Sequence, residues 1–307
     1  MKTIFNPKFL ISLTFSFVAL YYSFEDFNFN SFINIIKKTQ IIYIIIPCIL
    51  LIVSVWIRAL RWKYLITKND NIRVKDLFEL EMIGFFGNNI FPLRFGEFYR
   101  IFLLSQKFSL SKSLSAGSVF IERILDIIGL LALSFFLFFY PINFELKKYI
   151  VLSLFIFLVI LLLLIIVKDK IIQNNYSFFN DFFESFNILR SDHLKKIIFF
   201  TLMIWMIFWI NVHLIQFSLN IGLSIFDSLL ILLLSTLAIA IPAAPGMIGT
   251  FHFAVIFSME FLGFETDLGS TYAILLHAYG FITFTLIGLF YFLKYQTYYF
   301  SLKKNEK

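Results

Sequence analysis

The chain has 307 residues, of which 60% are hydrophobic and only 15% are charged. Soluble domains carry about 25% charged residues, so this chain has too few polar side chains to cover a water-facing surface. Its single cysteine excludes a disulfide framework and a thiolate metal cluster. The formal net charge of +7 could suit nucleic acid, but in so apolar a chain it indicates basic residues on the cytoplasmic side of a membrane. We therefore expect an integral membrane protein that binds no nucleic acid.

Six uninterrupted stretches are apolar enough to cross a bilayer, which takes roughly 20 residues per helix. They cover residues 7–24, 41–62, 114–140, 149–167, 197–219 and 270–293. No small-residue cleavage site follows the first stretch, so we interpret it as a retained helix and not as a signal peptide. The pattern predicts an all-α fold, a polytopic membrane helical bundle with about six spanning helices.

Two further apolar stretches are interrupted near their centres. One covers about residues 77–106 and breaks around Pro92; the other covers about residues 226–262 and breaks around Pro245 and Gly246. Proline removes an amide donor, and broken backbone is tolerated in lipid only where protein or water covers it. We therefore predict two re-entrant hairpins, each made of two half-helices that return to the side from which they entered.

The distribution of basic residues supports this topology. With the N-terminus inside and both hairpins returning, most of the 26 Lys and Arg residues fall on the cytoplasmic side, Arg58 and Arg61 among them. Lys37 and Lys38 fall on the outer side. This bias follows the positive-inside rule. We expect one transmembrane domain, residues 1–307, with both termini in the cytoplasm.

Six ionisable residues are expected at membrane depth, where a charge is costly and suggests a function. They are Arg94, Glu97 and Arg100, which share one helical face by their spacing, and Glu122, Arg123 and Asp126. Two interpretations stay open. In the structural one, the charges neutralise each other and lock the first hairpin against the helix that contains Glu122. In the functional one, they line a polar cavity where arginine binds a lipid phosphate in a bidentate manner and the carboxylates bind a cationic or hydroxylated head group.

The second break suggests another kind of site. A half-helix that begins after Gly246 would direct free amides and a positive dipole end into the membrane, as in transporters that bind anionic groups. The alternative is that Pro245 and Gly246 only form a turn. His252 and His277 are typical of hydrogen-bonded packing residues, with Glu260 as a candidate partner of His252, and we predict no metal site.

Taken together, these motifs resemble the lysylphosphatidylglycerol synthase transmembrane region, also called the flippase-like domain family. The resemblance rests on Asn89-x-x-Pro92-x-Arg94-x-Gly96-Glu97-x-x-Arg100, Glu122-Arg123-x-x-Asp126, Pro245-Gly246-x-Ile248-Gly249-Thr250-Phe251 and Leu275-Leu276-His277-Ala278. It implies a bacterial or archaeal inner-membrane protein. In fused members this domain moves aminoacylated phosphatidylglycerol between leaflets, and some stand-alone relatives are associated with glycolipid or cell-envelope biosynthesis.

Two departures limit what the resemblance implies. The family commonly has Glu where this chain has His252, which weakens the case for a cationic head group. The chain also ends soon after its last apolar stretch. We therefore expect no soluble synthetase domain and do not carry over the synthase activity.

The leading hypothesis is a flippase-like protein that moves a phospholipid, polyprenyl lipid or glycolipid head group between leaflets without its own ATPase. The candidate substrate-binding residues are Asn89, Arg94, Glu97, Arg100, Glu122, Arg123, Asp126, Pro245, Gly246, Gly249, His252 and His277. We expect no enzymatic activity and no cofactor, since the sequence contains no recognisable catalytic or nucleotide-binding motif. Two alternatives stay open, a membrane-embedded lipid transferase and an accessory protein of an envelope glycosyltransferase; a homodimer is also left open.

Overall fold

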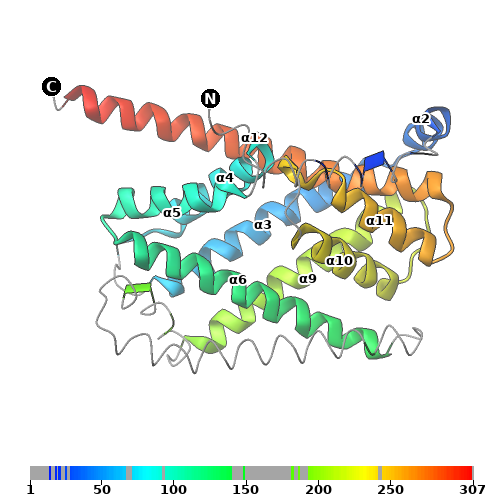
Figure 1. Cartoon of the computed structure of the whole chain (residues 1–307), viewed down its shortest axis with the longest axis horizontal. Coiled ribbons are helices and arrows are strands. Elements are labelled where there is room, and N and C mark those ends of the chain that lie inside the picture. Colours follow the sequence, from blue (N-terminus) through cyan, green and yellow to red (C-terminus); the bar gives the residue numbers. More distant parts are fainter. Residues whose placement is uncertain are drawn as a thin grey trace. The chain divides into compact units, whose positions relative to one another are not determined.

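The computed structural model describes residues 28–66, 71–91, 94–139, 193–240 and 244–305, with isolated residues between 14 and 25 and between 148 and 186. Across these described residues the regular secondary structure is helical (Figure 1). Helix is the expected outcome for long apolar segments, because each backbone amide finds its partner within the segment.

Within the part of the chain that the structure describes, three helices are long and apolar enough to cross a membrane by length and composition. They are α3 (Ile42–Leu65), α9 (Leu194–Ser218) and α12 (Thr266–Asn305). Each coincides with a predicted span, so three of the six predicted spans are confirmed as long apolar helices. The predicted spans at residues 7–24 and 149–167 lie almost entirely outside the described residues.

The predicted span at residues 114–140 forms α6 (Lys112–Ser134) and a short 3-10 helix, η1 (Phe135–Phe139). The Ser111 hydroxyl accepts a hydrogen bond from the Leu114 amide at 3.1 Å and so caps the start of α6. This helix carries the charges that interrupt its apolar pattern, and two of them, Glu122 and Asp126, are buried.

The first broken stretch forms α4 (Val74–Ile90) and α5 (Phe95–Phe108). Glycines bring the two helices together beside the break, since a Cβ on Gly96 would overlap the carbonyl oxygen of Gly84. At the other end of the pair, Lys107 Nζ lies 2.8 Å from Asp76 Oδ1. The two helices therefore run antiparallel, and the start of α4 lies beside the end of α5.

The second broken stretch forms α10 (Ile225–Ala240) and α11 (Thr250–Phe261), with the short 3-10 helix η3 (Pro245–Met247) between them. Helix α11 packs against both α10 and α12 (Figure 1). Gly246 and Gly249 adopt φ values of 66° and 98°, which favour glycine and fix the shape of this turn.

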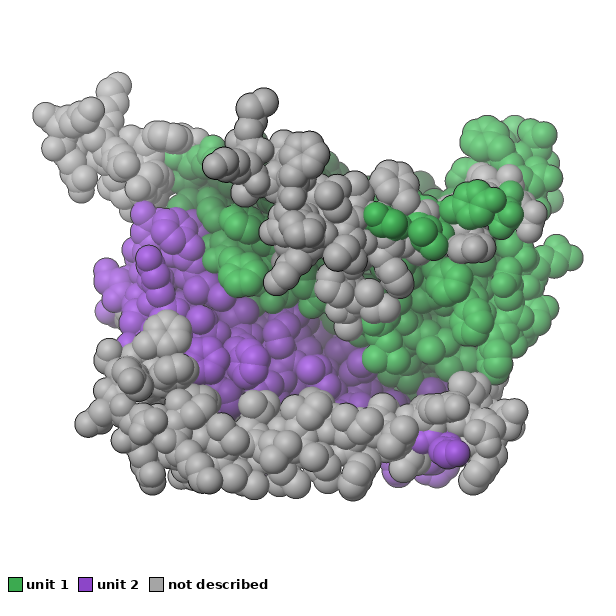
Figure 2. Space-filling view, viewed as in Figure 1, with its two compact units in different colours: residues 1–55, 78–100, 207–307 green, residues 56–77, 101–206 purple. Residues whose placement is uncertain are grey.

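The chain forms two compact units, coloured separately in Figure 2. Unit 1 contains residues 1–55, 78–100 and 207–307, and unit 2 contains residues 56–77 and 101–206. The described core of unit 1 includes Met82 and Tyr272, and that of unit 2 includes Trp62 and Leu104. Each unit has its own polar centre.

Candidate functional site

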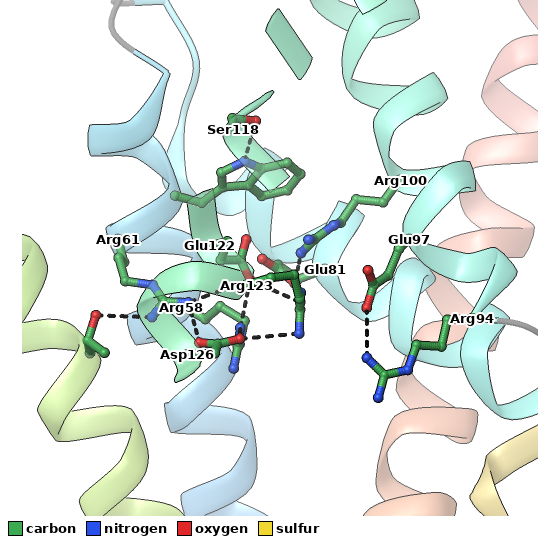
Figure 3. Close-up of polar contacts among 12 residues, drawn as sticks. Arg58, Arg61, Glu81, Arg94, Glu97, Arg100, Ser118, Glu122, Arg123 and Asp126 are labelled. Atoms are coloured by element: carbon green, nitrogen blue, oxygen red, sulfur yellow. Dashed lines mark hydrogen bonds and ion pairs between the residues drawn. The ribbon is translucent and has the colours of Figure 1, made fainter. Parts of the chain in front are cut away.

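The polar centre of unit 2 is an arginine–carboxylate cluster of Arg58, Arg61, Glu122, Arg123 and Asp126 (Figure 3). The first two residues lie on α3 and the other three on α6. Arg58 and Arg61 are three residues apart, and Glu122 and Asp126 are four apart, so each pair lies on one face of its helix. The cluster therefore joins two helix faces of opposite charge.

Each carboxylate of the cluster bonds to more than one arginine. Arg58 Nη1 donates to Glu122 Oε1 at 2.6 Å and to Asp126 Oδ2 at 2.8 Å. Arg61 Nη2 donates to Asp126 Oδ1 at 2.8 Å, and its Nη1 donates to Thr201 Oγ1 at 3.1 Å. Asp126 thus bridges the two arginines, and Arg61 also ties the cluster to α9.

Most of the cluster is closed to solvent. The exposed fractions of the side chains are 5% for Arg58 and 0% for both Arg61 and Glu122. Arg123 is the exception at 31%, and it lies 3.2 Å from Asp126 and 3.3 Å from Glu122. Removing one partner from a buried ion pair leaves an uncompensated charge, so these contacts resist exchange with a ligand.

The cluster corrects one sequence prediction and adds a partner. Arg58 and Arg61 were expected among the basic residues on the cytoplasmic side of the membrane, but both are buried against α6 carboxylates. Within unit 2 the carboxylates of Glu122 and Asp126 bond to α3, a partner that the sequence did not suggest. The available signal was spacing. Arg58 and Arg61 are three residues apart and Glu122 and Asp126 four apart, and either spacing places two charges on one face of a helix.

The polar centre of unit 1 is a junction of the two helix breaks. Arg94 lies in the first break, and its Nη2 donates to the carbonyl oxygen of Ile239 at 2.7 Å. Ile239 lies in the last turn of α10, where carbonyl groups lack helical partners. One hydrogen bond therefore links the break between α4 and α5 to the end of α10, where the second break begins.

Contacts with α12 complete the helix-break junction. Asn89 Nδ2 donates to the carbonyl oxygen of Phe281 at 3.1 Å and to Thr285 Oγ1 at 3.0 Å. His277 Nε2 lies 2.7 Å from the carbonyl oxygen of Gly246 and must donate, because a carbonyl only accepts. A Cβ on Gly246 would lie 2.8 Å from the Phe281 ring and 3.5 Å from the Asn89 carbonyl oxygen. The two breaks and α12 thus meet closely.

Arg94 and Glu97 are the open part of this junction. Their side chains are 34% and 21% exposed, with Arg94 Nη1 3.9 Å from Glu97 Oε1 (Figure 3). Arg94 has a φ of 54°, a left-handed conformation that is uncommon for a residue other than glycine. Strained backbone of this kind often accompanies a functional site.

Arg100 behaves differently from the residues with which it was grouped. It pairs with Glu81 on α4, and both side chains are almost fully buried. Arg94 and Glu97 are neighbours, as their spacing predicted, but Arg100 turns toward α4, so the three side chains do not form one charged face. Glu81 was missed by the sequence analysis; the signal was a carboxylate directly before the apolar run of residues 82–86 in α4.

The two histidines among the candidate site residues lie close together in unit 1. The ring centroids of His252 and His277 are 4.7 Å apart, and His252 is buried. Glu260 accepts a hydrogen bond from Thr266 Oγ1 at 2.6 Å, so the predicted pairing of Glu260 with His252 is not seen. Among the described residues, no group of three or more His, Cys, Asp and Glu side chains could hold a metal ion.

The predicted half-helix after Gly246 begins at Thr250, with Gly249 as its N-cap residue. Glycine has no side chain with which to cap the first amides, and no side-chain hydrogen bond is made there. Pro245 begins the short turn η3, which shapes the break. This leaves the α11 N-terminus as polar backbone within the second broken stretch.

Comparison with known proteins gives the same picture of a membrane protein. The chain is 28% identical over 232 residues to UPF0104 membrane protein MJ1078 of Methanocaldococcus jannaschii, covering 72% of this chain and 99% of that protein. It is also 28% identical over 176 residues to UPF0104 membrane protein MJ1595 of the same organism, covering 55% of this chain and 52% of that protein. No solved structure matches the chain.

The family model described as the lysylphosphatidylglycerol synthase TM region matches residues 9–288. The match includes both helix breaks and both polar centres. The chain is a membrane-embedded protein that belongs to the lysylphosphatidylglycerol synthase TM region family.

Proposed function

We propose that this protein moves the head group of a phospholipid or glycolipid between the two leaflets of the inner membrane. The observation that carries the proposal is the meeting of two helix breaks in unit 1, through Arg94 and the carbonyl oxygen of Ile239. Broken helices at membrane depth occur where they line a cavity, and they form substrate sites in transporters. The name of the matched family agrees with a lipid-related role.

Arg94 is the residue we assign to the lipid phosphate. Its planar guanidinium binds phosphate oxygens in a bidentate manner, and its 34% exposure leaves part of it open to a ligand. A charged phosphate forms stronger hydrogen bonds than the neutral carbonyl of Ile239 does. A head group that enters the junction can therefore replace this carbonyl as the partner of Arg94.

Neighbouring residues of the junction complete the assignment. Glu97, beside Arg94, would meet a hydroxyl or cationic group of the same head group. The amides at the start of α11, after Gly249, would add donors for an anionic group. Asn89 and His277 bond to backbone or hydroxyl groups of this unit and would hold the breaks in place.

The re-entrant course of the first broken stretch is part of the proposal. The ion pair between Asp76 and Lys107, 2.8 Å long, joins the start of α4 to the end of α5 and supports a return to the side of entry. With both broken stretches re-entrant, the N- and C-termini lie in the cytoplasm, as the distribution of Lys and Arg favours. The breaks would then meet at membrane depth.

Net movement would be driven by the distribution of the lipid between the two leaflets and not by ATP. The sequence contains no phosphate-binding loop of the Walker type. Net direction would follow a lipid gradient, or the consumption of the lipid on one side of the membrane. Movement in both directions is therefore expected when neither is imposed.

The test is a lipid-accessibility assay with purified protein in vesicles and without ATP. Fluorescent anionic, zwitterionic and aminoacylated phospholipids, and a polyprenyl-phosphate glycolipid, are each placed in both leaflets, and the fraction open to an external quencher is followed. We expect at least one lipid to become fully accessible faster than in protein-free vesicles, with its mass unchanged. Movement no faster than in protein-free vesicles for all the lipids would contradict the proposal. A new lipid product would support the transferase alternative instead.

A further inference from the structure

Helix α2 (Phe29–Lys37) has an amphipathic pattern that the proposed transport does not use. Four of its five apolar residues follow the spacing i, i+3, i+4 and i+7, which places them on one helical face. They are Phe29, Phe32, Ile33 and Ile36; Ile35, three residues after Phe32, extends the edge of this face. The polar residues that separate them are Asn30, Ser31 and Asn34, and two lysines, Lys37 and Lys38, follow at the end.

The helix is defined at both ends by its own residues. The Asn28 side chain accepts a hydrogen bond from the Ser31 amide at 3.0 Å, and Lys38 is the C-cap residue. A helix of nine residues is too short to be stable alone in water. It needs a surface that covers its apolar face.

The rest of unit 1 covers that face only in part. Helix α2 packs against α12, yet none of its nine residues is buried. Phe29 keeps 64% of its surface exposed. The apolar exposure continues on α3, where Ile42 and Ile49 are 51% and 56% exposed. Because α3 is long and apolar enough to span a membrane, its exposed face would meet lipid, and α2 precedes it by only a few residues.

We propose that α2 lies in the head-group region of the bilayer as an interfacial helix, and that Lys37 and Lys38 bind the phosphates of anionic lipids. A basic amphipathic helix of this kind places its apolar face at the boundary of the acyl chains. The two lysines are exposed and adjacent in the sequence, so they give α2 a cationic end that complements anionic head groups.

A second copy of the chain is a poorer occupant of this face. A stable protein interface buries about 800 Å² on each partner, which the few apolar side chains of one short helix cannot supply. A lipid surface needs no such area, since α3 and α12 already hold the chain in the membrane. The proposal does not depend on lipid movement by the helix-break junction.

The first test compares two neighbouring positions, one on the apolar face of α2 and one on its polar face. Phe29→Cys and Asn30→Cys, each in a Cys48→Ser background, are labelled with an environment-sensitive fluorophore and reconstituted in vesicles whose lipids carry a nitroxide high in the acyl chain. We expect quenching to be several-fold stronger at position 29 than at position 30, independent of protein density. Equal quenching would overturn the proposal. So would shielding at position 29 that appears only at high protein density, because it would indicate a second copy.

The second test addresses the lysines. The preference of the position-29 label for quenching by nitroxide-labelled phosphatidylglycerol over phosphatidylcholine is compared between the parent and a Lys37→Gln, Lys38→Gln variant. We expect the preference to fall by up to about fivefold per lysine, and to weaken with added salt. The control replaces another exposed adjacent pair, Lys195→Gln and Lys196→Gln, and should leave the preference unchanged. An unchanged preference in the Lys37, Lys38 variant would overturn the assignment of these lysines.

Discussion

The arginine–carboxylate cluster of unit 2 and the helix-break junction of unit 1 both contain charges in an apolar chain, but they differ in exposure. Arg61 and Glu122 have no exposed side-chain surface, and Asp126 bonds to two arginines. The Arg94 side chain in the junction is 34% exposed and donates to the backbone carbonyl of Ile239. Arg94 itself has a left-handed backbone conformation. Charge alone therefore does not distinguish the two polar centres; exposure and the kind of partner do.

The difference has an energetic basis. Charges taken out of water are costly, and each charge of the cluster is compensated mainly by its ionic partners. Breaking such a contact exposes nothing to a ligand and leaves an unpaired charge inside the protein. The bond from Arg94 to a neutral carbonyl is weaker than a bond to phosphate, so it can be exchanged at little cost. We assign fold stability to the cluster and lipid contact to the junction.

The largest expected effect is on stability in the cluster. Glu122→Gln should lower the stability of the protein in detergent by about 3–5 kcal/mol, because Arg58 would lose a buried carboxylate partner. The measurement is the Tm of purified protein. Glu79→Gln is the matched control: Glu79 pairs with Lys294, which is 53% exposed, so its loss should cost less than about 1 kcal/mol. Equal Tm shifts for the two variants would contradict the division of roles.

The junction depends on close packing of its helices, which Gly96→Ala should disturb. The new methyl group would overlap the backbone of α4 at Gly84 and Asn88. We expect a loss of about 1–3 kcal/mol, measured as a lower Tm. Gly280→Ala in α12 meets nothing within 4 Å and should leave the Tm unchanged or slightly raised. A neutral Gly96→Ala would show that α4 and α5 are not tightly packed beside the break.

The smallest expected effect concerns Asp76, whose ion pair with Lys107 joins the start of α4 to the end of α5, away from the break. Burial raises the pKa of this carboxyl, but Arg73 and Lys107 outweigh burial and hold the pKa below its usual value. Its stabilising contribution is therefore present above the unfolded pKa of about 3.9 and is lost as the pH falls through the lower folded pKa. Asp76→Asn should remove this part of the acid-dependent loss of Tm. Identical plots of Tm against pH for the parent and the Asp76→Asn variant would contradict the account.

The sequence predicted the long apolar helices and the positions of both breaks, because hydropathy and Pro or Gly act locally. It did not predict that Arg58 and Arg61 turn inward. Their place near the end of an apolar run, followed by further basic residues, made a surface position the simplest interpretation. Their carboxylate partners lie more than 60 residues away. The spacing of the two arginines indicates one charged helix face, but it does not say which helix carries the partners.

The junction shows the same limit. Both breaks and the residues Arg94 and Gly246 were predicted individually, but their meeting through Ile239 and α12 depends on tertiary packing. The pairing of Arg100 with Glu81 was missed for a related reason. Spacing placed Arg100 on the face of Arg94 and Glu97. Those two residues do lie side by side, but Arg100 contacts Glu81 on the neighbouring helix α4 instead.

The most direct test of the central claim is the initial rate of lipid movement by Arg94→Asn, measured beside its Tm. Asparagine tolerates the left-handed backbone of this position but removes the guanidinium. We predict that the rate falls by at least about tenfold, as expected for losing a charged hydrogen-bond donor, while the Tm falls much less than in Glu122→Gln, since the hydrogen bond that is lost goes to a neutral carbonyl. Arg73→Asn, at a side chain that is 76% exposed, should move lipid as the parent does. Parent-like movement by Arg94→Asn would contradict the claim that the helix-break junction binds the head group.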